Sequence, residues 1–292
     1  MKHAEQLYYR LGATLYMPAI MPDLAQRLTT TQAGSVVLCT EDAISEHQIE
    51  SALKNINKLL MSFPQIKTNL FIRARSPQVL SNLLSLATIE QIKGFVIPKI
   101  DHSNVYEYKE AIEDSGKNSF HLMPTIETEV AFDNQELIRL RKIIDTFSVG
   151  IPCFRIGGND LLNLLNIKRP DYVTIYETPV RIAIDNCITA FRPFGYQLSA
   201  PVFEYIDDEN LPLLKKELML DRAYGFHNKT AIHPIQVPLI QEILSFKNEE
   251  IDLAKKIILH QDKAVFKEAG QMCEPSTHIN WAKKVLSIDG RK

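Results

Sequence analysis

The sequence predicts an α/β protein with the architecture of a TIM (β/α)8 barrel and a C-terminal helical extension. Eight short apolar runs recur along the chain, polar stretches with helical period lie between them, and no strand-like run follows Gln236. Parallel strands need crossover connections of this kind, and eight strand–helix repeats are typical of the barrel. A doubly wound open sheet is the alternative, but no G-x-G-x-x-G motif follows the first run.

The eight predicted strands are short, apolar and separated by segments that contain turn-forming residues. In chain order they are Ala13–Met17, Ser35–Cys39, Asn69–Arg73, Gly94–Pro98, His121–Ile126, Pro152–Ile156, Gln197–Pro201 and Phe226–Ile232. Helical period is clearest in residues 49–60 and 137–147, where apolar residues recur three or four positions apart.

We expect two parts in the chain: a barrel core at residues 1–235 and a helical extension at residues 236–292. The extension contains three predicted helices, Val237–Phe246, Glu249–Ala269 and Ile279–Ser287. It is too short and too helical for a separate α/β domain. We expect it to pack on the barrel or on a neighbouring subunit, or to reach over an active site.

Composition and charge exclude several classes of protein. The chain has 292 residues, 45% of them hydrophobic, and a net charge of −2, so it lacks the basic footprint of a nucleic-acid-binding protein. No apolar stretch approaches the roughly 20 residues of a membrane span, and no signal-like segment opens the chain. The four cysteines form no CxxC motif and are expected to be reduced and structural. The expected location is the cytoplasm.

Two acidic residues stand at the ends of the fifth and sixth predicted strands. Glu127 follows His121–Ile126, and Asp160 follows Pro152–Ile156 after a short turn. The carboxyl ends of barrel strands share one face, where active sites lie. Oxygen ligands are what a hard cation such as Mg²⁺ prefers, with water and substrate completing its shell. The sequence therefore predicts a metal site at Glu127 and Asp160.

Other charged residues follow the second, third and fourth strands. They are Glu41, Asp42, Arg73, Arg75 and Lys99. Such charges also cap helices or form loop ion pairs, and the alternation of a strand lets only one of Arg73 and Arg75 point into the barrel. An arginine at this face binds carboxylate or enolate oxygens in a fork.

Seven segments match, in order, the motifs of one family. They are Leu15–Ala19, Leu38–Ile44, Ile72–Arg73, Gly94–Lys99, Ile126–Thr128, Gly157–Asp160 and Gly225–Pro234 with Gln236. The chain thereby resembles the superfamily of the citrate lyase β-subunit and 4-hydroxy-2-oxo-acid (HpcH/HpaI) aldolases, which are TIM-barrel carbon–carbon lyases.

The resemblance implies a Mg²⁺-dependent lyase or aldolase that cleaves or forms a small 2-oxo acid, hydroxy acid or acyl substrate. Glu127 and Asp160 would hold the metal, and Arg73 would bind the oxygen that becomes an enolate. Glu274, in a turn near the C-terminus, matches an acid that relatives use for proton transfer. Relatives usually form trimers or hexamers, so a homo-oligomer is expected.

We also expect supporting roles for other residues around the metal. Residues expected to complete the catalytic site are Glu41, Asp42 and Lys99, and residues expected to contact a small anionic substrate are Arg73, Arg75, Gly158 and Asn159.

The sequence departs from the family pattern at several positions. Gly12 and Ala13 replace an Arg-Ser pair, Cys39 replaces an acid, Arg75 replaces an asparagine, and Asn228 replaces a glycine. Several of these positions bind coenzyme A or order substrate loops in relatives, so the departures weigh against a coenzyme A thioester. Arg75 points instead to another anion, such as a phosphorylated one. The alternative functions are a thioester hydrolase, a phosphoenolpyruvate-type transferase and a catalytically silent barrel that binds a metabolite.

Overall fold

The computed structural model describes residues 2–63 and 66–289. These residues form two compact units, which divide between Leu244 and Ser245. The first unit includes helix α10 (Val237–Leu244), which the sequence had assigned to the extension. The packing of the extension on a barrel or on a neighbouring subunit stays a prediction.

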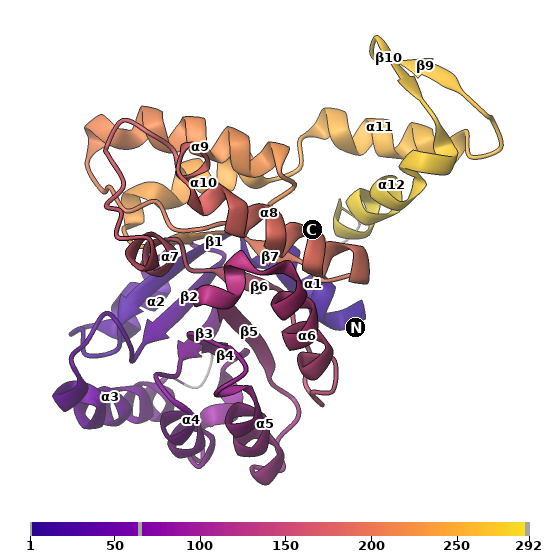
Figure 1. Cartoon of the computed structure of the whole chain (residues 1–292). Coiled ribbons are helices and arrows are strands. Elements are labelled where there is room, and N and C mark those ends of the chain that lie inside the picture. Colours follow the sequence, from indigo (N-terminus) through magenta and orange to yellow (C-terminus); the bar gives the residue numbers. More distant parts are fainter. Residues whose placement is uncertain (1, 64–65, 290–292) are drawn as a thin grey trace. The chain divides into compact units, whose positions relative to one another are not determined.

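Eight parallel strands form the centre of the first unit (Figure 1). They are β1 (Ala13–Pro18), β2 (Ser35–Cys39), β3 (Asn69–Arg73), β4 (Gly94–Ile97), β5 (His121–Ile126), β6 (Phe154–Ile156), β7 (Leu198–Ser199) and β8 (Lys229–Ala231). Neighbours in the chain are neighbours in the sheet from β1 to β7, and β8 pairs with β1. A parallel bridge between Ala200 and Lys229 joins β7 to β8 and closes the barrel. The TIM-barrel prediction is confirmed, and closure excludes the open sheet.

Helices follow the strands and surround them (Figure 1). The α-helices of this unit are α1 (Lys2–Leu11), α2 (Leu24–Thr30), α3 (Ile49–Ser62), α4 (Pro77–Leu84), α5 (Val105–Asp114), α6 (Asn134–Ile144), α7 (Gly158–Leu164), α8 (Val180–Phe191), α9 (Leu211–Ala223) and α10. Short 3-10 helices are η1 (Glu46–Gln48), η2 (Ile89–Gln91), η3 (Glu129–Phe132), η4 (Ile175–Glu177), η5 (Arg192–Phe194), η6 (Asp208–Asn210) and η7 (Pro234–Gln236). The periodic stretches at 49–60 and 137–147 correspond to α3 and α6, each of which buries one apolar face.

The barrel interior has an apolar layer near the amino ends of the strands. Tyr8 and Leu11 of α1 pack there on inward-facing residues of four strands, namely Val37, Phe71, Val96 and Met123, and on Cys153, which directly precedes β6. Because side chains alternate along a strand, the residues two positions further on face the same interior, nearer the carboxyl ends. Those residues include Arg73 and Arg155, so the next layer is polar and charged.

A buried ionic cluster joins β8 to α9. Lys229 is fully buried, and its Nζ lies 2.9 Å from Glu217 Oε1 and 2.9 Å from Asp221 Oδ2. Glu217 also forms an ion pair with Arg169 at 2.9 Å, and the Tyr176 hydroxyl donates a hydrogen bond to Asp221 at 2.6 Å. Burial raises the pKa of Asp221 to about 6, although Lys229 opposes the shift. Two cations and two acids therefore compensate one another in this cluster.

The second unit consists of α11 (Asn248–Leu259), a β-hairpin of β9 (Phe266–Glu268) and β10 (Gln271–Cys273), and α12 (Pro275–Asp289). A helical extension is confirmed, but the predicted continuous helix over Glu249–Ala269 is wrong. Ala269 and Gly270 both have positive φ, 46° and 80°, which is the backbone of a two-residue type I′ turn that favours a hairpin. The helices share a small apolar core of Ile251, Ala254, Ile257, Ala282 and Val285.

Within the described ranges 2–63 and 66–289, no helix is both long and apolar enough to cross a membrane. The four cysteines are buried and unpaired, in agreement with a structural role.

Candidate active site

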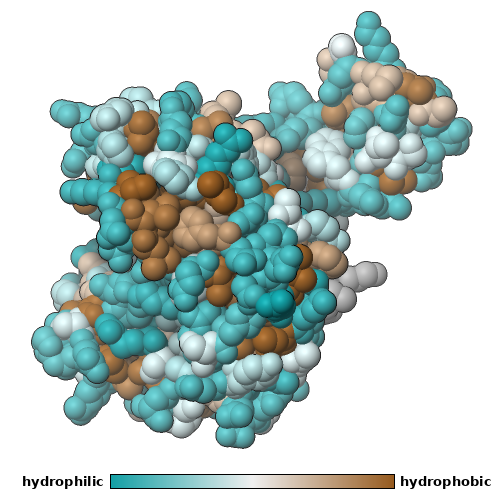
Figure 2. All heavy atoms as spheres, viewed as in Figure 1, coloured by the Kyte–Doolittle hydropathy of each residue, from teal (hydrophilic) through white to brown (hydrophobic). Residues whose placement is uncertain are grey.

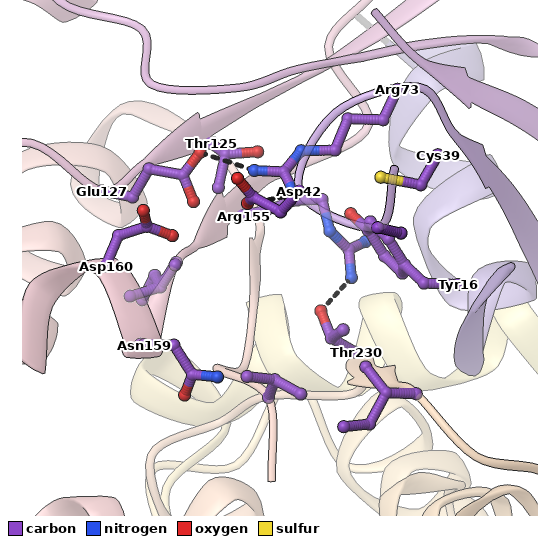
Figure 3. A pocket seen from close by; sticks show the side chains of 16 residues that line it. Tyr16, Cys39, Asp42, Arg73, Thr125, Glu127, Arg155, Asn159, Asp160 and Thr230 are labelled. Atoms are coloured by element: carbon purple, nitrogen blue, oxygen red, sulfur yellow. Dashed lines mark hydrogen bonds and ion pairs between the residues drawn. The ribbon is translucent and has the colours of Figure 1, made fainter. Parts of the chain in front are cut away.

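A pocket of about 280 Å³ opens at the carboxyl ends of the barrel strands (Figure 3). Its lining residues come from most of the strands and from the turns that follow them: Tyr16, Cys39, Asp42, Ala43, Arg73, Thr125, Glu127, Arg155, Ile156, Gly157, Gly158, Asn159, Asp160, Val202, Thr230 and Ile232. This volume suits a small metabolite. Both predicted metal ligands are among the lining residues.

Glu127 stands directly after β5 and is 4% exposed. Its Oε1 accepts hydrogen bonds from the backbone N–H of Lys99 at 2.8 Å and from Arg73 Nη2 at 3.0 Å. Burial raises the pKa of Glu127 to about 7, with the charge of Arg73 acting against the rise and that of Asp160 adding to it. The carboxylate is thus fixed in position by two hydrogen bonds, in a buried place that disfavours its charged form.

Gly157 makes room for Glu127. A Cβ at Gly157 would lie 2.0 Å from Glu127 Oε2 and 2.4 Å from Glu127 Cβ, so any larger residue collides with the carboxylate. Gly157 has an ordinary negative φ of −88°. Space, and not backbone conformation, therefore requires glycine at this position.

Asp160 lies in the first turn of α7, with its side chain 30% exposed. Figure 3 shows its carboxylate beside that of Glu127 in one corner of the pocket. Lys99 Nζ lies 3.5 Å from Asp160 Oδ1. The two acids that the sequence singled out therefore face the same space.

Arg73, at the end of β3, is held by three carboxylates. Its Nη1 donates to Asp42 at 3.0 Å, and its Nη2 lies 2.8 Å from Glu41 and 3.0 Å from Glu127. A guanidinium has five N–H groups, so two are left beyond these contacts, one on Nη1 and the one on Nε. The alternation argument is correct: Arg73, and not Arg75, points into the barrel.

Lys99 contacts, through its side chain, two of the three acids that hold Arg73. Its Nζ lies 2.7 Å from Glu41 and 3.2 Å from Asp42, and its φ of 48° is in the left-handed region. Such a conformation is costly for a residue other than glycine and is typical of functional sites. Here it directs the Lys99 N–H at Glu127. Glu41 and Lys99 are not among the lining residues, but they form ion pairs with residues that are.

Glu41 and Asp42 have pKa values displaced in opposite directions. Burial raises the pKa of Glu41, against the charge of Arg73. Burial acts in the same sense on Asp42, but its hydrogen bond with Glu41 and the charges of Arg73 and Lys99 together lower the pKa of Asp42. The two acids are in contact with the same cations, Arg73 and Lys99, so their titrations are coupled.

The donor set fits a magnesium ion. No group of three or more His, Cys, Asp or Glu side chains arranged to hold a metal occurs among the described residues, but Mg²⁺ commonly takes only one or two carboxylates and completes its octahedron with water and substrate. Glu127 and Asp160 repel each other, and burial disfavours the charge of Glu127. A divalent cation between them would offset both effects.

The remaining predicted site residues divide into three groups. Gly158 and Asn159 line the pocket. Arg75 does not: its guanidinium donates to the carbonyl oxygens of Thr40 (3.0 Å), Glu41 (2.8 Å) and Ile44 (2.6 Å). Arg75 therefore contacts the loop after β2 and does not reach the pocket. Glu274 lies in the second unit, where its backbone N–H donates to His278 Nδ1 at 3.2 Å, and its catalytic role stays a prediction.

Sequence reasoning missed four polar residues of the pocket: Tyr16, Thr125, Arg155 and Thr230. Arg155 could have been found, because it is an arginine between Phe154 and Ile156 in an otherwise apolar strand. The others are common in strands and carry no such signal.

The chain matches the family model "C-C_Bond_Lyase of the TIM-Barrel fold" over residues 5–288. Among curated proteins, mitochondrial citramalyl-CoA lyase of Rattus norvegicus is 24% identical over 282 residues, covering 91% of this chain and 79% of the relative. The (3S)-malyl-CoA thioesterase of Cereibacter sphaeroides (strain ATCC 17025) is 32% identical over 115 residues. That match covers 39% of this chain and only 36% of the thioesterase.

Solved structures show the same fold at low sequence identity. The CitE protein of Mycobacterium tuberculosis in complex with magnesium, acetoacetate and coenzyme A has a TM-score of 0.68 and 20% identity, covering 97% of this chain and all (100%) of that one. A citrate lyase of Burkholderia xenovorans LB400 has a TM-score of 0.76 and 16% identity, covering 96% and 92%. Since the family model spans nearly the whole chain, this protein belongs to the C–C bond lyase family of the TIM-barrel fold.

Proposed function

We propose that this protein is a Mg²⁺-dependent carbon–carbon lyase or aldolase that cleaves or forms a small 2-oxo or hydroxy acid. One observation carries the proposal: Glu127 and Asp160 face a single pocket beside Arg73, whose guanidinium is fixed by three carboxylates. This arrangement combines oxygen donors for a hard cation with a cation that stabilises developing negative charge.

The relatives support the same chemistry. The rat relative is named a citramalyl-CoA lyase, and M. tuberculosis CitE is described in complexes with magnesium and acetoacetate, pyruvate or oxaloacetate. By analogy, a small oxo acid is the expected ligand of this pocket. A coenzyme A thioester is the alternative, since CitE is also described with coenzyme A.

Most of the site residues that the sequence predicted have a part in the proposed reaction. Glu127 and Asp160 would hold Mg²⁺, which when bound polarises a carbonyl oxygen. The free N–H of Arg73 Nη1 would donate to the substrate oxygen on which negative charge develops. Glu41, Asp42 and Lys99 keep Arg73 in place. Gly158 and Asn159 border the space in which the substrate lies, and Glu274 is the proposed acid or base for proton transfer.

A thioester hydrolase is the second candidate. One relative, at 32% identity, is named a (3S)-malyl-CoA thioesterase, although the match covers only 36% of that protein. Both activities would use the same metal and the same oxo-acid end of the substrate, and they differ in whether water attacks a thioester. Product analysis with a malyl-type thioester distinguishes them: release of free thiol without an aldehyde or oxo-acid fragment indicates hydrolysis.

Asp160→Asn tests the metal assignment. The variant should lose measurable Mg²⁺ binding in calorimetry and at least about 100-fold of Mg²⁺-dependent deuterium exchange into pyruvate or oxaloacetate, because the ion loses one of its two proposed carboxylate ligands. Asp114→Asn, which removes an exposed carboxylate at the carboxyl end of α5, is the control and should retain both. Full activity of Asp160→Asn would falsify the metal assignment.

Two further expectations accompany this proposal. We place the protein in the cytoplasm, and we expect a homo-oligomer, as either a trimer or a hexamer.

A further inference from the structure

Arg155 lies in the polar layer inside the barrel and takes no part in the proposed reaction. It belongs to β6, is 2% exposed and lines the pocket. Its Nη2 donates to Thr230 Oγ1 at 2.6 Å, while the contacts of Nη1 with Asn228 Oδ1 (3.5 Å) and Met123 Sδ (3.8 Å) are long. The guanidinium also lies 5.4 Å from the centre of the Tyr16 ring.

The two arginines of this layer have opposite electrostatic surroundings. Arg73 is surrounded by three carboxylates. In the part of the chain that the structure describes, no carboxylate lies within the 4.0 Å of an ion pair with Arg155. An arginine stays charged in proteins, and a buried charge without a counter-ion is costly. The anion that compensates Arg155 is therefore to be sought outside the chain.

The neighbouring strands provide hydroxyl groups around Arg155. The parallel register pairs Arg155 with Thr125 on β5 and with Ser199 on β7. Both residues are buried, and neither hydroxyl has a hydrogen-bond partner within residues 2–63 and 66–289. Thr230 accepts from Arg155 and so keeps its own hydroxyl proton to donate. A buried cation with adjacent unsatisfied hydroxyl groups is a suitable site for an anionic oxygen.

The position of this group relative to the metal ligands suggests which anion it binds. Figure 3 shows Arg155 reaching toward Thr230, away from the corner occupied by Glu127 and Asp160. A substrate whose oxo-acid end lies at that corner would direct its other end toward Arg155. The pocket, at about 280 Å³, is large enough for a compact metabolite that spans both positions.

We propose that Arg155, with Thr125 and Thr230, binds a second anionic group of the substrate, which is therefore a small acid with an additional carboxylate or phosphate at its far end. The inference rests on the proposed function for the orientation of the substrate. Arg155 touches no reacting atom in this arrangement and determines specificity. A forked, charge-assisted contact of this kind favours a dianion over the matching monoanion by roughly ten- to a hundredfold.

The test compares ligands of equal carbon number by calorimetry in the presence of Mg²⁺. One pair is 2-oxovalerate and 2-oxoglutarate, which differ in the far carboxylate, and a second is hydroxypyruvate and 3-phosphohydroxypyruvate, which differ in a phosphate. The proteins are the wild type, Arg155→Gln, Arg155→Lys and the control Arg181→Gln, in which an exposed arginine of α8 is replaced. Thermal melting checks that each variant folds.

We expect the wild type and Arg181→Gln to prefer at least one dianion by about tenfold or more. In Arg155→Gln the preference should fall to about twofold or less while affinity for the monoanion is retained. Arg155→Lys should keep part of the preference for the dianion, since an ammonium has the same charge but cannot form the two parallel hydrogen bonds of a guanidinium. If Arg155→Gln does not fold, Arg155→Lys provides the test. Its preference for the dianion should be smaller than that of the wild type, and an unchanged preference would contradict the inference.

Three results would overturn the inference: a wild type that prefers neither dianion, a preference that persists in Arg155→Gln, or equal weakening of monoanion and dianion in a folded Arg155→Gln. Metal-free titrations with valerate and glutarate separate this inference from the proposed function. If glutarate binding depends on Arg155 but Mg²⁺ neither binds nor promotes exchange, the anion site stands and the lyase proposal fails.

Discussion

Glu127 is positioned by contacts from three neighbouring segments of the barrel. The turn after β4 supplies the Lys99 N–H, β3 supplies Arg73, and the turn after β6 supplies the space left by Gly157. A carboxylate fixed in this way loses little side-chain entropy on binding a ligand. If Glu127 binds the proposed metal, these three segments hold it in place for that contact.

Gly157→Ala should weaken Mg²⁺ binding by at least about tenfold. The new methyl group would lie 2.0 Å from Glu127 Oε2, so the carboxylate must turn away from Asp160, and metal sites tolerate little displacement of their ligands. Calorimetric titration with Mg²⁺ measures the change.

Gly158→Ala is the matched comparison for this prediction. Its new Cβ would meet Ile175 Cδ1 at 2.6 Å and Pro201 Cβ at 3.0 Å, which are apolar atoms. We expect it to reduce the melting temperature more than the affinity for Mg²⁺. Equal Mg²⁺ affinity in Gly157→Ala and the wild type would show that Glu127 is not a ligand or that it can move freely.

At the scale of elements, the loop between β2 and η1 depends on Arg75. This loop carries Glu41 and Asp42, and three of its carbonyl oxygens accept from the Arg75 guanidinium. The same two acids hold Arg73. Arg75 is therefore a positioning residue: it holds the loop whose acids hold Arg73, and it does not line the pocket itself.

Arg75→Ala should lower the free energy of unfolding by about 1–3 kcal/mol, because buried carbonyl groups lose a charged donor. It should also lower kcat, since Glu41 and Asp42 would hold Arg73 less firmly, with little change in KM. Urea unfolding and steady-state kinetics test both effects. A raised KM with unchanged stability would instead support the substrate-binding role that the sequence suggested.

The ionic cluster between β8 and α9 should give stability a pH dependence of unusual sign. Burial raises the pKa of Asp221 to about 6 from its ordinary value of 3.8, so the folded state holds this proton more tightly than the unfolded state. The stabilising contribution is complete below about pH 4 and is lost as the pH rises through 6.

Asp221→Asn removes this titration and keeps an oxygen that can accept from Tyr176. Between pH 4 and 7, the wild type should lose stability relative to the variant, by at most about 3 kcal/mol over the range. Urea midpoints at successive pH values give the slope. A constant difference between the two proteins would mean that Asp221 does not titrate in this window.

At the scale of the whole molecule, barrel closure brings together residues that are far apart in the chain. Arg73 on β3 meets Glu127 after β5, and Arg155 on β6 meets Thr230 on β8. Consecutive strand order and a common direction place every strand end at one face. The pocket is therefore a property of the closed sheet and of no single segment.

The predicted homo-oligomer can be tested directly. Figure 2 shows apolar side chains gathered on part of the drawn face, at the level of α7, within a mostly polar surface. Exposed apolar patches commonly mark interfaces. Light scattering after size-exclusion chromatography should give the mass of a trimer or a hexamer. A monomer at all concentrations would contradict the prediction.

The sequence by itself determined the barrel. All eight strands lie within or close to the predicted ranges, because apolar runs of strand length separated by helical period admit few packings. It also identified Glu127, Asp160 and Arg73 as pocket residues, since position at a strand end largely fixes which face a residue reaches. It missed the hairpin at Phe266–Cys273, whose two-residue turn overrides a weak helical pattern.

Only the tertiary structure decided which charges meet. Strand alternation showed that one of Arg73 and Arg75 points inward, but not that three carboxylates hold Arg73 or that Arg75 binds a loop. Arg155 has no carboxylate partner within the described residues, because the neighbouring strands place Thr125 and Ser199 beside it. The physical reason is that electrostatic contacts act over a few ångströms between distant segments. Local sequence determines the position of a residue on its strand, and closure of the barrel determines which side chains it contacts.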